Sequence, residues 1–315
     1  MKQLPLVILA GPTAVGKTDT SIALARAIGG EIISAYSMQV YKYMDIGSAK
    51  ITKEEMEGVP HYLVDMIEPS EEFNVCRFAA MAKEAMAQIY AKGKIPILVG
   101  GTGFYIQAVL YDIDFTETNE DTAFREECEE FAKEHGSQAL HDKLRAVDEA
   151  SAEAIHANNI KRVIRALEYH HQTGRKISEH NEEERKKVSP YNACYFVLND
   201  RRDIVYDRIN YRVDKMIEAG LVEEVQSLKD IGCKSGMVSM QGLGYKEILS
   251  YLDGDITLEE AIEIIKKETR HFAKRQLTWF RREPDVVWVQ KDVIGRDKES
   301  CVNFMLSELR KRDII

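Results

Sequence analysis

Gly11-Pro12-Thr13-Ala14-Val15-Gly16-Lys17-Thr18 directly follows the apolar run Pro5 to Ala10 and precedes a helical stretch. The octapeptide matches G-x-x-x-x-G-K-[ST], the phosphate-binding loop, in its strand-loop-helix context. The glycines let backbone N–H groups turn toward phosphate oxygens, and the start of the helix adds positive potential. Lys17 supplies a cation and Thr18 a hydroxyl ligand for Mg²⁺. The segment therefore predicts a phosphate site with a magnesium ion at Thr18.

Around this loop, apolar runs alternate with helical stretches. Strands are expected at 5–10, 31–37, 61–67 and 95–100, which implies parallel strands joined by crossover helices. Helices are expected at 17–28, ending at Gly29-Gly30, and at 75–92, with Asn74 as N-cap. The predicted fold class is α/β, with a P-loop NTPase-like parallel sheet.

The middle of the chain changes character. Between about residues 116 and 189 it is charged and helix-rich without a strand pattern, which predicts an all-helical domain at 116–193 inserted into a core of 1–115 and 194–315. The core resumes with a strand at 194–199, a helix at 257–282 and a last strand at 286–290.

Composition limits the class of protein. The chain has 315 residues, of which 44% are hydrophobic, and no apolar run approaches the roughly 18 residues that span a membrane, so a cytoplasmic protein is expected. The five cysteines form no C-x-x-C pair, which argues against a zinc site or a disulfide framework. The net charge of −9 opposes RNA binding unless positive charge gathers on one surface.

A second glycine loop, Gly100-Gly-Thr-Gly-Phe-Tyr105, follows the strand at 95–100. Ligands of open α/β sheets bind at the carboxyl ends of strands, so Thr102 is either a hydroxyl donor facing the first loop or part of a packing turn. On the two loops alone, a small-molecule kinase that binds ATP is an alternative. ATP hydrolysis or nucleotide-dependent stabilisation would favour the kinase.

Four further segments carry a resemblance: SAYSMQVY at 34–41, MDIGSAK at 44–50, RVIRALE at 162–168 and KRQLTWFR at 274–281. With the two loops, they make the chain resemble the bacterial tRNA dimethylallyltransferases over nearly its whole length. The resemblance implies transfer of a dimethylallyl group from its diphosphate to the exocyclic amine of the adenosine 3′ of the anticodon. The phosphate loop would then hold the departing diphosphate, with Mg²⁺ as cofactor.

The resemblance also implies roles for single residues. Thr102 would lie beside the bridging oxygen of the diphosphate, and Arg212 would grip that group with two donors. Tyr36 stands where the family carries an aspartate that accepts a hydrogen bond or a proton from the attacking amine. A phenol with an ordinary pKa of about 10 is a poor base near neutral pH.

Three explanations of Tyr36 are open: a natural variant of reduced rate, a substitution in this chain, or a base relocated to Asp45 or Asp65. We favour impaired chemistry with binding largely retained. A tRNA-binding protein that has lost catalysis is a further alternative.

Contacts to the anticodon stem-loop follow from the same resemblance. Ile160, Val163, Ile164 and Leu167 recur at helical spacing as one buried face, which leaves Lys161, Arg162 and Arg165 off that face. An isopentenyltransferase acting on free adenylates would share the chemistry, but the basic helix of the insert argues for tRNA. The expected tRNA-binding residues are Tyr36, Ser37, Met38, Gln39, Thr102, Arg125, Lys161, Arg162, Arg165, Gln241, Gly242, Gly244 and Tyr245. A monomer is expected.

Overall fold

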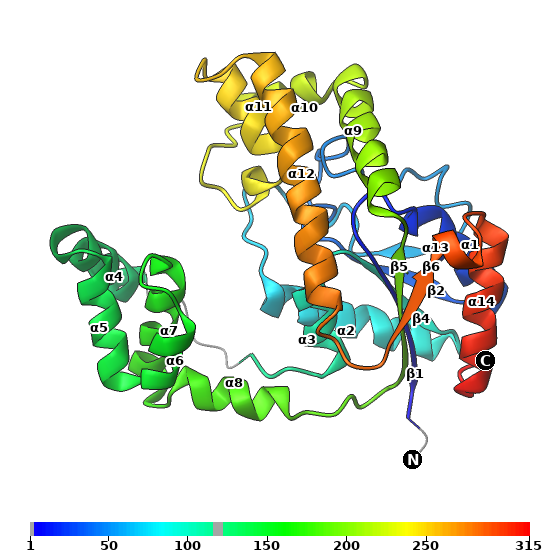
Figure 1. Cartoon of the computed structure of the whole chain (residues 1–315), viewed down its shortest axis with the longest axis horizontal. Helices are drawn as coiled ribbons and strands as arrows, with labels where there is room; N and C mark the ends of the chain where they lie inside the picture. The colour runs from blue at the N-terminus through cyan, green and yellow to red at the C-terminus, as the bar shows by residue number, and fades with distance from the viewer. Residues whose placement is uncertain (1–2, 116–121) are drawn as a thin grey trace. The chain divides into compact units, whose positions relative to one another are not determined.

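A computed structural model of the chain describes residues 3–115 and 122–315 (Figure 1). It divides into two compact units, one made of Met1–Tyr111 with Ser189–Ile315 and the other of Asp112–Val188. The division falls a few residues before the expected boundaries at 116 and 193. Near the two ends of the second unit, Lys187 donates a hydrogen bond to the Asp112 carbonyl at 3.2 Å.

The first unit is built on a six-stranded sheet in the order β3-β2-β4-β1-β5-β6. Every pair of neighbouring strands is parallel. The strands are β1 (Pro5–Ala10), β2 (Glu31–Ala35), β3 (His61–Tyr62), β4 (Pro96–Gly100), β5 (Asn192–Asn199) and β6 (Val286–Gln290). The parallel α/β core predicted from the sequence is therefore confirmed.

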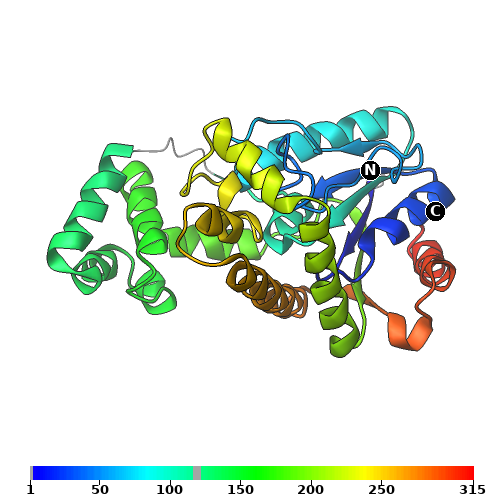
Figure 2. The same ribbon diagram turned by 90° about the horizontal axis from the view of Figure 1, so that it is seen from above.

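Helices cover both faces of this sheet, because alternate strand residues enter two separate apolar cores. In β1, Leu6 and Ile8 join one core, while Val7 and Leu9 join the other. The first core is closed by helices that include α2 (Val75–Ala91), α3 (Gly103–Leu110) and α12 (Leu258–Phe280). The second is closed by α1 (Lys17–Ile28) and α14 (Lys298–Lys311). Figure 2 shows α2 and α14 on opposite sides of the sheet.

The remaining helices of this unit follow β5. They are α9 (Arg202–Glu218), α10 (Leu221–Asp230), η1 (Ser239–Gln241), α11 (Tyr245–Leu252) and, after β6, α13 (Lys291–Ile294). Helix α9 packs against α12 through Val205, Ile209 and Ala273. Figure 1 shows the two helices as neighbours.

Two expected helix ends are confirmed. Helix α1 closes at Gly29, whose φ of 64° is the left-handed conformation that glycine adopts without strain. The Asn74 side chain caps α2 by accepting a hydrogen bond from the backbone N–H of Arg77 at 3.0 Å.

The strand predicted at 61–67 is wrong beyond Tyr62. Leu63 and Asp65 have φ values of 62° and 61°, which an extended strand cannot contain. The chain therefore turns after β3, and only Ile67 pairs again, in an isolated bridge with Tyr41. The strand expected at 31–37 is also shorter, because β2 ends at Ala35 and leaves Tyr36 in the following loop.

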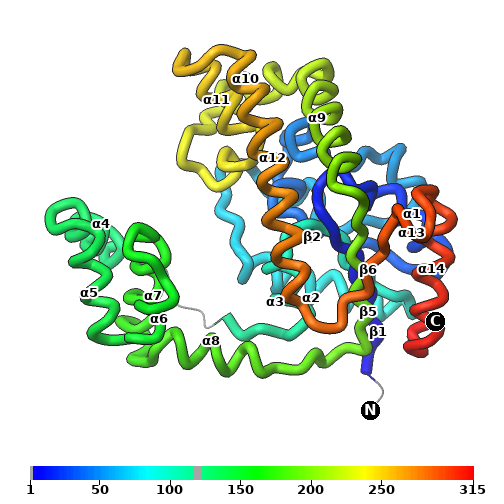
Figure 3. The backbone as a smooth tube through the Cα atoms, in the orientation of Figure 1, coloured from blue at the N-terminus to red at the C-terminus, as the bar shows by residue number. Residues whose placement is uncertain are grey.

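The second unit contains five helices within its described residues: α4 (Thr122–His135), α5 (Ser137–Val147), α6 (Glu149–Ala154), α7 (Ile160–Thr173) and α8 (Ile177–Arg185). Figure 3 traces α4, α5 and α7 packed side by side. The face predicted on α7 is confirmed, since Val163, Ile164 and Leu167 are buried and Ile160 packs against their cluster. Among residues 3–115 and 122–315, no helix combines the length and apolar character needed to cross a membrane.

Candidate functional site

The strand order brings three loops to one edge of the sheet. β4 lies between β1 and β2, and Gly100 is in register with Ala10 on one side and Ala35 on the other. The chain leaves these strands at their carboxyl ends, where open α/β sheets bind ligands. The phosphate loop, the loop at Tyr36 and the loop at Thr102 are therefore neighbours.

Lys17 lies inside the phosphate loop. Its side chain is buried, and Nζ donates to the carbonyl oxygens of Gly11 at 2.9 Å and Pro12 at 2.8 Å. Burial, together with repulsion from Arg212, lowers the pKa of Lys17 to about 7. The loop thus holds a lysine whose charge changes near neutral pH.

Arg212 reaches the same loop from α9. Its Nη1 donates to the Thr13 hydroxyl oxygen at 3.2 Å. Burial lowers the pKa of the guanidinium from its ordinary value. The basic side chains of Lys17 and Arg212 therefore both lie at the phosphate loop. This arrangement suits an anion of high charge.

Tyr36 lies against this cationic cluster. The Lys17 ammonium is 5.5 Å from the centroid of the Tyr36 ring. Burial raises the pKa of the Tyr36 hydroxyl well above its ordinary value, so the phenol keeps its proton at neutral pH. Thr18, Tyr36 and Gln39 line a narrow cavity of about 20 Å³ beside the ring.

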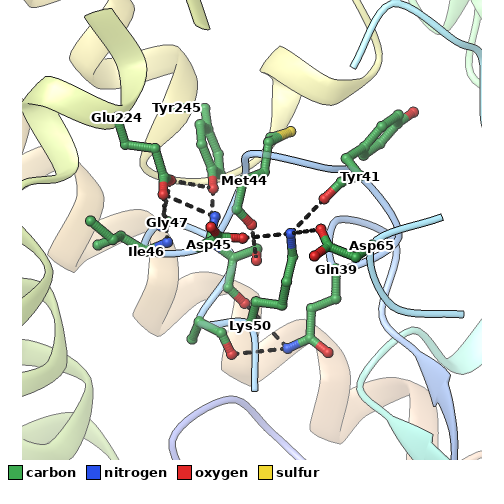
Figure 4. Close-up of polar contacts among 12 residues, drawn as sticks. Gln39, Tyr41, Met44, Asp45, Ile46, Gly47, Lys50, Asp65, Glu224 and Tyr245 are labelled. Carbon is green, nitrogen blue, oxygen red and sulfur yellow. Dashed lines mark hydrogen bonds and ion pairs between the residues drawn. The ribbon is translucent and has the colours of Figure 1, made fainter. Parts of the chain in front are cut away.

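The two carboxylates considered as a relocated base are already engaged. Asp45 and Asp65 each lie 2.6 Å from Nζ of Lys50, whose side chain is buried (Figure 4). Either aspartate would have to give up its ion pair with Lys50 to act as the base in place of a carboxylate at position 36.

Each glycine of the second loop allows a close approach. A Cβ on Gly100 would lie 2.2 Å from the Ala35 carbonyl oxygen. Cβ atoms on Gly101 and Gly103 would lie 2.2 Å from Gln276 Nε2 and Trp279 Cδ1, respectively. Thr102, between Gly101 and Gly103, is the N-cap residue of α3. Its backbone N–H donates to the Ala35 carbonyl at 3.4 Å. The loop is thus fixed on one side by β2 and on the other by α12.

Two further residues at these loops, Gln276 and Lys291, were not predicted from the sequence to belong to the site. Gln276 of α12 accepts a hydrogen bond from Thr13 N at 2.9 Å and donates one to the Gly101 carbonyl at 2.9 Å. Buried Lys291 donates to the Val15 carbonyl at 3.2 Å. Lys291 directly follows β6, so the rule that ligands bind at the carboxyl ends of strands was an available signal. Gln276 lies within the segment 274–281 that carried the family resemblance.

The loops at 36–39 and 241–245, both expected to contact RNA, lie against each other. A Cβ on Gly242 would be 3.1 Å from both Met38 Sδ and Tyr245 Cδ2. Ser37 and Met38 are partly buried, and Gln241 is exposed. Gly244 has a φ of 96°, which favours glycine at the start of α11.

The side chains of Gln39 and Tyr245 are buried in the structure. The Gln39 side chain accepts a hydrogen bond from Ser34 Oγ at 3.1 Å and donates one to the Ala49 carbonyl at 3.0 Å. Tyr245 is fully buried, and its hydroxyl accepts from Ser48 N at 3.0 Å. Their side chains hold the segment 44–50 in place, so any contact of these residues with RNA must involve backbone atoms or a rearrangement.

Glu224 of α10 completes this support and was not anticipated. Its carboxylate accepts hydrogen bonds from the backbone N–H groups of Asp45, Ile46 and Gly47 at 2.9, 2.7 and 3.1 Å (Figure 4). It also accepts one from the Tyr245 hydroxyl at 2.8 Å. No local sequence pattern around Glu224 predicts this role, because the residues that it contacts in the segment 45–47 lie far away in the chain.

The basic residues expected to bind RNA from the insert divide into two groups. Lys161 and Arg162 are exposed on α7. Arg125 and Arg165 instead hold the buried Glu168, with Arg125 Nε and Arg165 Nη1 each 2.8 Å from a carboxylate oxygen. Burial alone would raise the pKa of Glu168, but hydrogen bonds from the two arginines lower it below its ordinary value.

A further basic surface lies on α12. Its groove of about 370 Å³ is lined by His271, Lys274, Arg275, Thr278, Trp279 and Arg282. Basic groups interleaved with an aromatic ring suit a nucleic-acid strand, whose phosphates and bases they can hold. Phe280 is fully buried, as expected of a core residue.

The donors near Thr18 are compatible with Mg²⁺ held mainly by a substrate. The described residues contain no group of three or more His, Cys, Asp or Glu side chains placed to bind a metal. Thr18 offers one hydroxyl at the beginning of α1, beside the cavity at Tyr36. Magnesium commonly takes most of its ligands from substrate phosphates and water, which fits a single protein hydroxyl.

A phosphate loop beside the basic side chains of Lys17 and Arg212, faced by a second glycine loop on a parallel sheet, places the chain in the class of P-loop-like α/β proteins. The chain belongs to the IPP transferase family: the profile of that family matches residues 39–283, and that of isopentenyl transferases matches residues 4–72.

Individual relatives agree with this assignment. The chain is 61% identical over 311 residues, 99% of each chain, to a tRNA dimethylallyltransferase of Lachnoclostridium phytofermentans. It is similar to the crystal structure of the tRNA isopentenylpyrophosphate transferase of Bacillus halodurans, with 46% identity, a TM-score of 0.74 and coverage of 99% and 98% of the two chains. It is also similar to a eukaryotic dimethylallyltransferase acting on tRNA, with 29% identity, a TM-score of 0.80 and coverage of 97% and 80%.

Proposed function

We propose that the chain transfers a dimethylallyl group from dimethylallyl diphosphate to the exocyclic amine of the adenosine 3′ of the anticodon in tRNA, with release of diphosphate. The observation that carries the proposal is the meeting of Lys17, Arg212 and the Thr102 loop at one edge of the sheet, in a chain 61% identical to a tRNA dimethylallyltransferase. An anion of high charge and its reacting carbon could both be held there.

In the proposed reaction, the exocyclic nitrogen forms a bond to the allylic carbon while the bond from that carbon to the bridging oxygen breaks. The electron pair of the broken bond moves onto diphosphate. Lys17, Arg212 and the N–H groups of the phosphate loop would stabilise that charge, and the Thr102 hydroxyl would donate to the bridging oxygen. Mg²⁺ bound to Thr18 and the diphosphate would neutralise part of the charge on the leaving group.

The amine must also lose a proton. Because the Tyr36 hydroxyl keeps its own proton, the amine proton would pass to water or to the departing diphosphate. General-base catalysis typically contributes a factor of about 10²–10⁴, so this route predicts a slow enzyme that binds its substrates well.

The tRNA would be held by two surfaces. On the insert, Lys161 and Arg162 would contact phosphates, with Arg125 and Arg165 fixed behind them on Glu168. On the core, the loops at 36–39 and 241–245 and the groove on α12 would receive the unstacked anticodon loop. Flipping out the target base costs a few kcal/mol in a single-stranded loop. With tRNA as substrate, we expect the protein to act in the cytoplasm, as a monomer.

The proposal is tested by incubating the chain with labelled dimethylallyl diphosphate, Mg²⁺ and unmodified tRNA. Label should enter the tRNA, and nuclease digestion should place it on the adenosine 3′ of the anticodon. A tRNA with guanosine at that position is the matched control and should stay unlabelled. Nucleotide-dependent stabilisation by ATP together with no labelling of tRNA would point instead to a kinase.

A further inference from the structure

The side chain of Gln276 joins the two glycine loops of the site. Its Oε1 accepts a hydrogen bond from the backbone N–H of Thr13, and its Nε2 donates one to the Gly101 carbonyl, each at 2.9 Å. The side chain is only 6% exposed. An amide carries an acceptor and a donor at one end, whereas a carboxylate or an aliphatic group of the same length could satisfy at most one of these partners.

The contact is tight as well as polar. A Cβ on Gly101 would lie 2.2 Å from Gln276 Nε2, and one on Gly103 would lie 2.2 Å from Trp279 Cδ1. These two glycines flank Thr102 in the sequence. Helix α12 therefore contacts the chain immediately before and immediately after Thr102. Through Gln276, the same helix also holds Thr13, whose hydroxyl bonds Arg212.

We propose that Gln276 is a positioning residue that fixes the distance between the diphosphate cradle and Thr102. The inference rests on the proposed function of these loops and adds a residue to that site. The hydrogen bonds of its amide group go to loop backbone, to Thr13 N and the Gly101 carbonyl, so it would act through Thr13 and Thr102 rather than on the substrate. Displacement of reacting groups by about 1 Å can cost roughly 100-fold in rate, which is the scale of effect that such a residue controls.

Two variants of similar length separate this role from simple space filling. Gln276→Met removes both hydrogen bonds but keeps most of the volume. Gln276→Glu keeps an acceptor for Thr13 N but loses the donor to Gly101 and adds a negative charge beside the diphosphate cradle. Gln226→Met is the matched control, because Gln226 is an exposed helical glutamine that donates to Asp230 at 2.7 Å.

The first measurement is binding of inorganic diphosphate with Mg²⁺ by calorimetry. Affinity should fall in the order Gln, Met, Glu, by about tenfold for Gln276→Met, and should be unchanged for Gln226→Met. The second measurement is single-turnover transfer to tRNA, in which Gln276→Met should be about 100-fold slower. The tRNA affinity of both Gln276 variants should stay within about twofold of the native value.

Arg275, the residue before Gln276 on α12, should show the opposite pattern of binding effects. It is exposed and lines the basic groove, so Arg275→Ala should weaken tRNA binding without changing the affinity for diphosphate. If Arg275→Ala and Gln276→Met lower both affinities together, α12 is generally disturbed and the specific role of Gln276 is refuted.

Other results are equally decisive. Gln276 variants that remain folded, with native diphosphate affinity and native transfer rate, would refute the proposal. A native chain that binds diphosphate with the expected order among variants, yet labels no tRNA, would overturn the proposed function while leaving the loop assignment in place. A native chain that binds no diphosphate would overturn both.

Discussion

The ammonium group of Lys17 lies over the ring of Tyr36, 5.5 Å from the ring centroid. Arg212 adds a second positive charge, and its repulsion helps lower the pKa of Lys17 to about 7. The neutral phenol leaves these cations without a counterion from position 36. The free site therefore favours an incoming polyanion, and position 36 offers no carboxylate as a base.

Replacing Tyr36 by aspartate should raise the rate of transfer. At pH 7 we expect a gain of at least about tenfold in kcat, since a positioned general base contributes about 10²–10⁴. The assay is labelled dimethylallyl transfer at saturating diphosphate substrate and tRNA. Tyr36→Asn is the matched control for size, because its amide cannot accept the proton. Equal rates for Tyr36 and Tyr36→Asp would mean that the reaction needs no base at this position.

Diphosphate binding should depend on pH through Lys17. The protonated lysine binds the anion more tightly, so affinity should be highest below the Lys17 pKa of about 7 and should decline as the pH rises through that value. Calorimetry from pH 6 to 9 measures the trend. Lys17→Met should bind weakly and lack this decline, and subtracting its curve removes the titration of diphosphate itself. An aspartate at position 36 should move the decline to higher pH, because a nearby carboxylate stabilises the ammonium.

Lys291 should strengthen anion binding from outside the phosphate loop. It is buried, its Nζ donates to the Val15 carbonyl, and a Cβ on Gly16 would lie 3.2 Å from that nitrogen. Lys291→Met should weaken diphosphate binding by about tenfold, through loss of a charge and of a contact that fixes the loop. Lys298→Met, a change at an exposed lysine on α14, is the control and should have no effect. Equal diphosphate affinities of Lys291→Met and Lys298→Met would mean that Lys291 contributes to packing and does not strengthen anion binding.

The core of the site could be predicted because its signals are local. The phosphate loop, α1 and β1 follow from adjacent residues whose backbone preferences and periodicity agree, and α1 and β1 have the predicted bounds. The strand expected at 61–67 was wrong beyond Tyr62, because its apolar residues fit a strand while Leu63 and Asp65 adopt positive φ. Apolar patterning reports burial but does not report a turn that tertiary contacts impose.

The supporting residues could not be predicted in the same way. Gln276 lies 263 positions from Thr13, and Glu224 lies 177 positions from Gly47. Such contacts depend on how helices pack on the sheet, which no short pattern encodes. Among the residues predicted to bind RNA, Gln39 and Tyr245 are buried for the same reason: their polarity is used inside the protein.

Glu224 should stabilise the loops expected to meet RNA without touching RNA itself. Its carboxylate accepts three backbone N–H groups and the Tyr245 hydroxyl, and a glutamine would direct an NH₂ group at some of these donors. Glu224→Gln should lower the free energy of unfolding by about 2 kcal/mol, the scale of losing charge-assisted hydrogen bonds to partly buried donors. Urea denaturation measures this change.

The neighbouring Glu223 gives the control, because it is exposed; Glu223→Gln should change stability by less than about 0.5 kcal/mol. In Glu224→Gln, hydrogen exchange at the amides of Ile46 and Gly47 should quicken, while Gly11 to Thr18 keep their protection. Affinity for tRNA should fall and affinity for diphosphate should not, because the segment 44–50 braces Gln39 and Tyr245 rather than the phosphate loop. Native exchange rates at residues 46 and 47 would show that Glu224 is not what holds this segment.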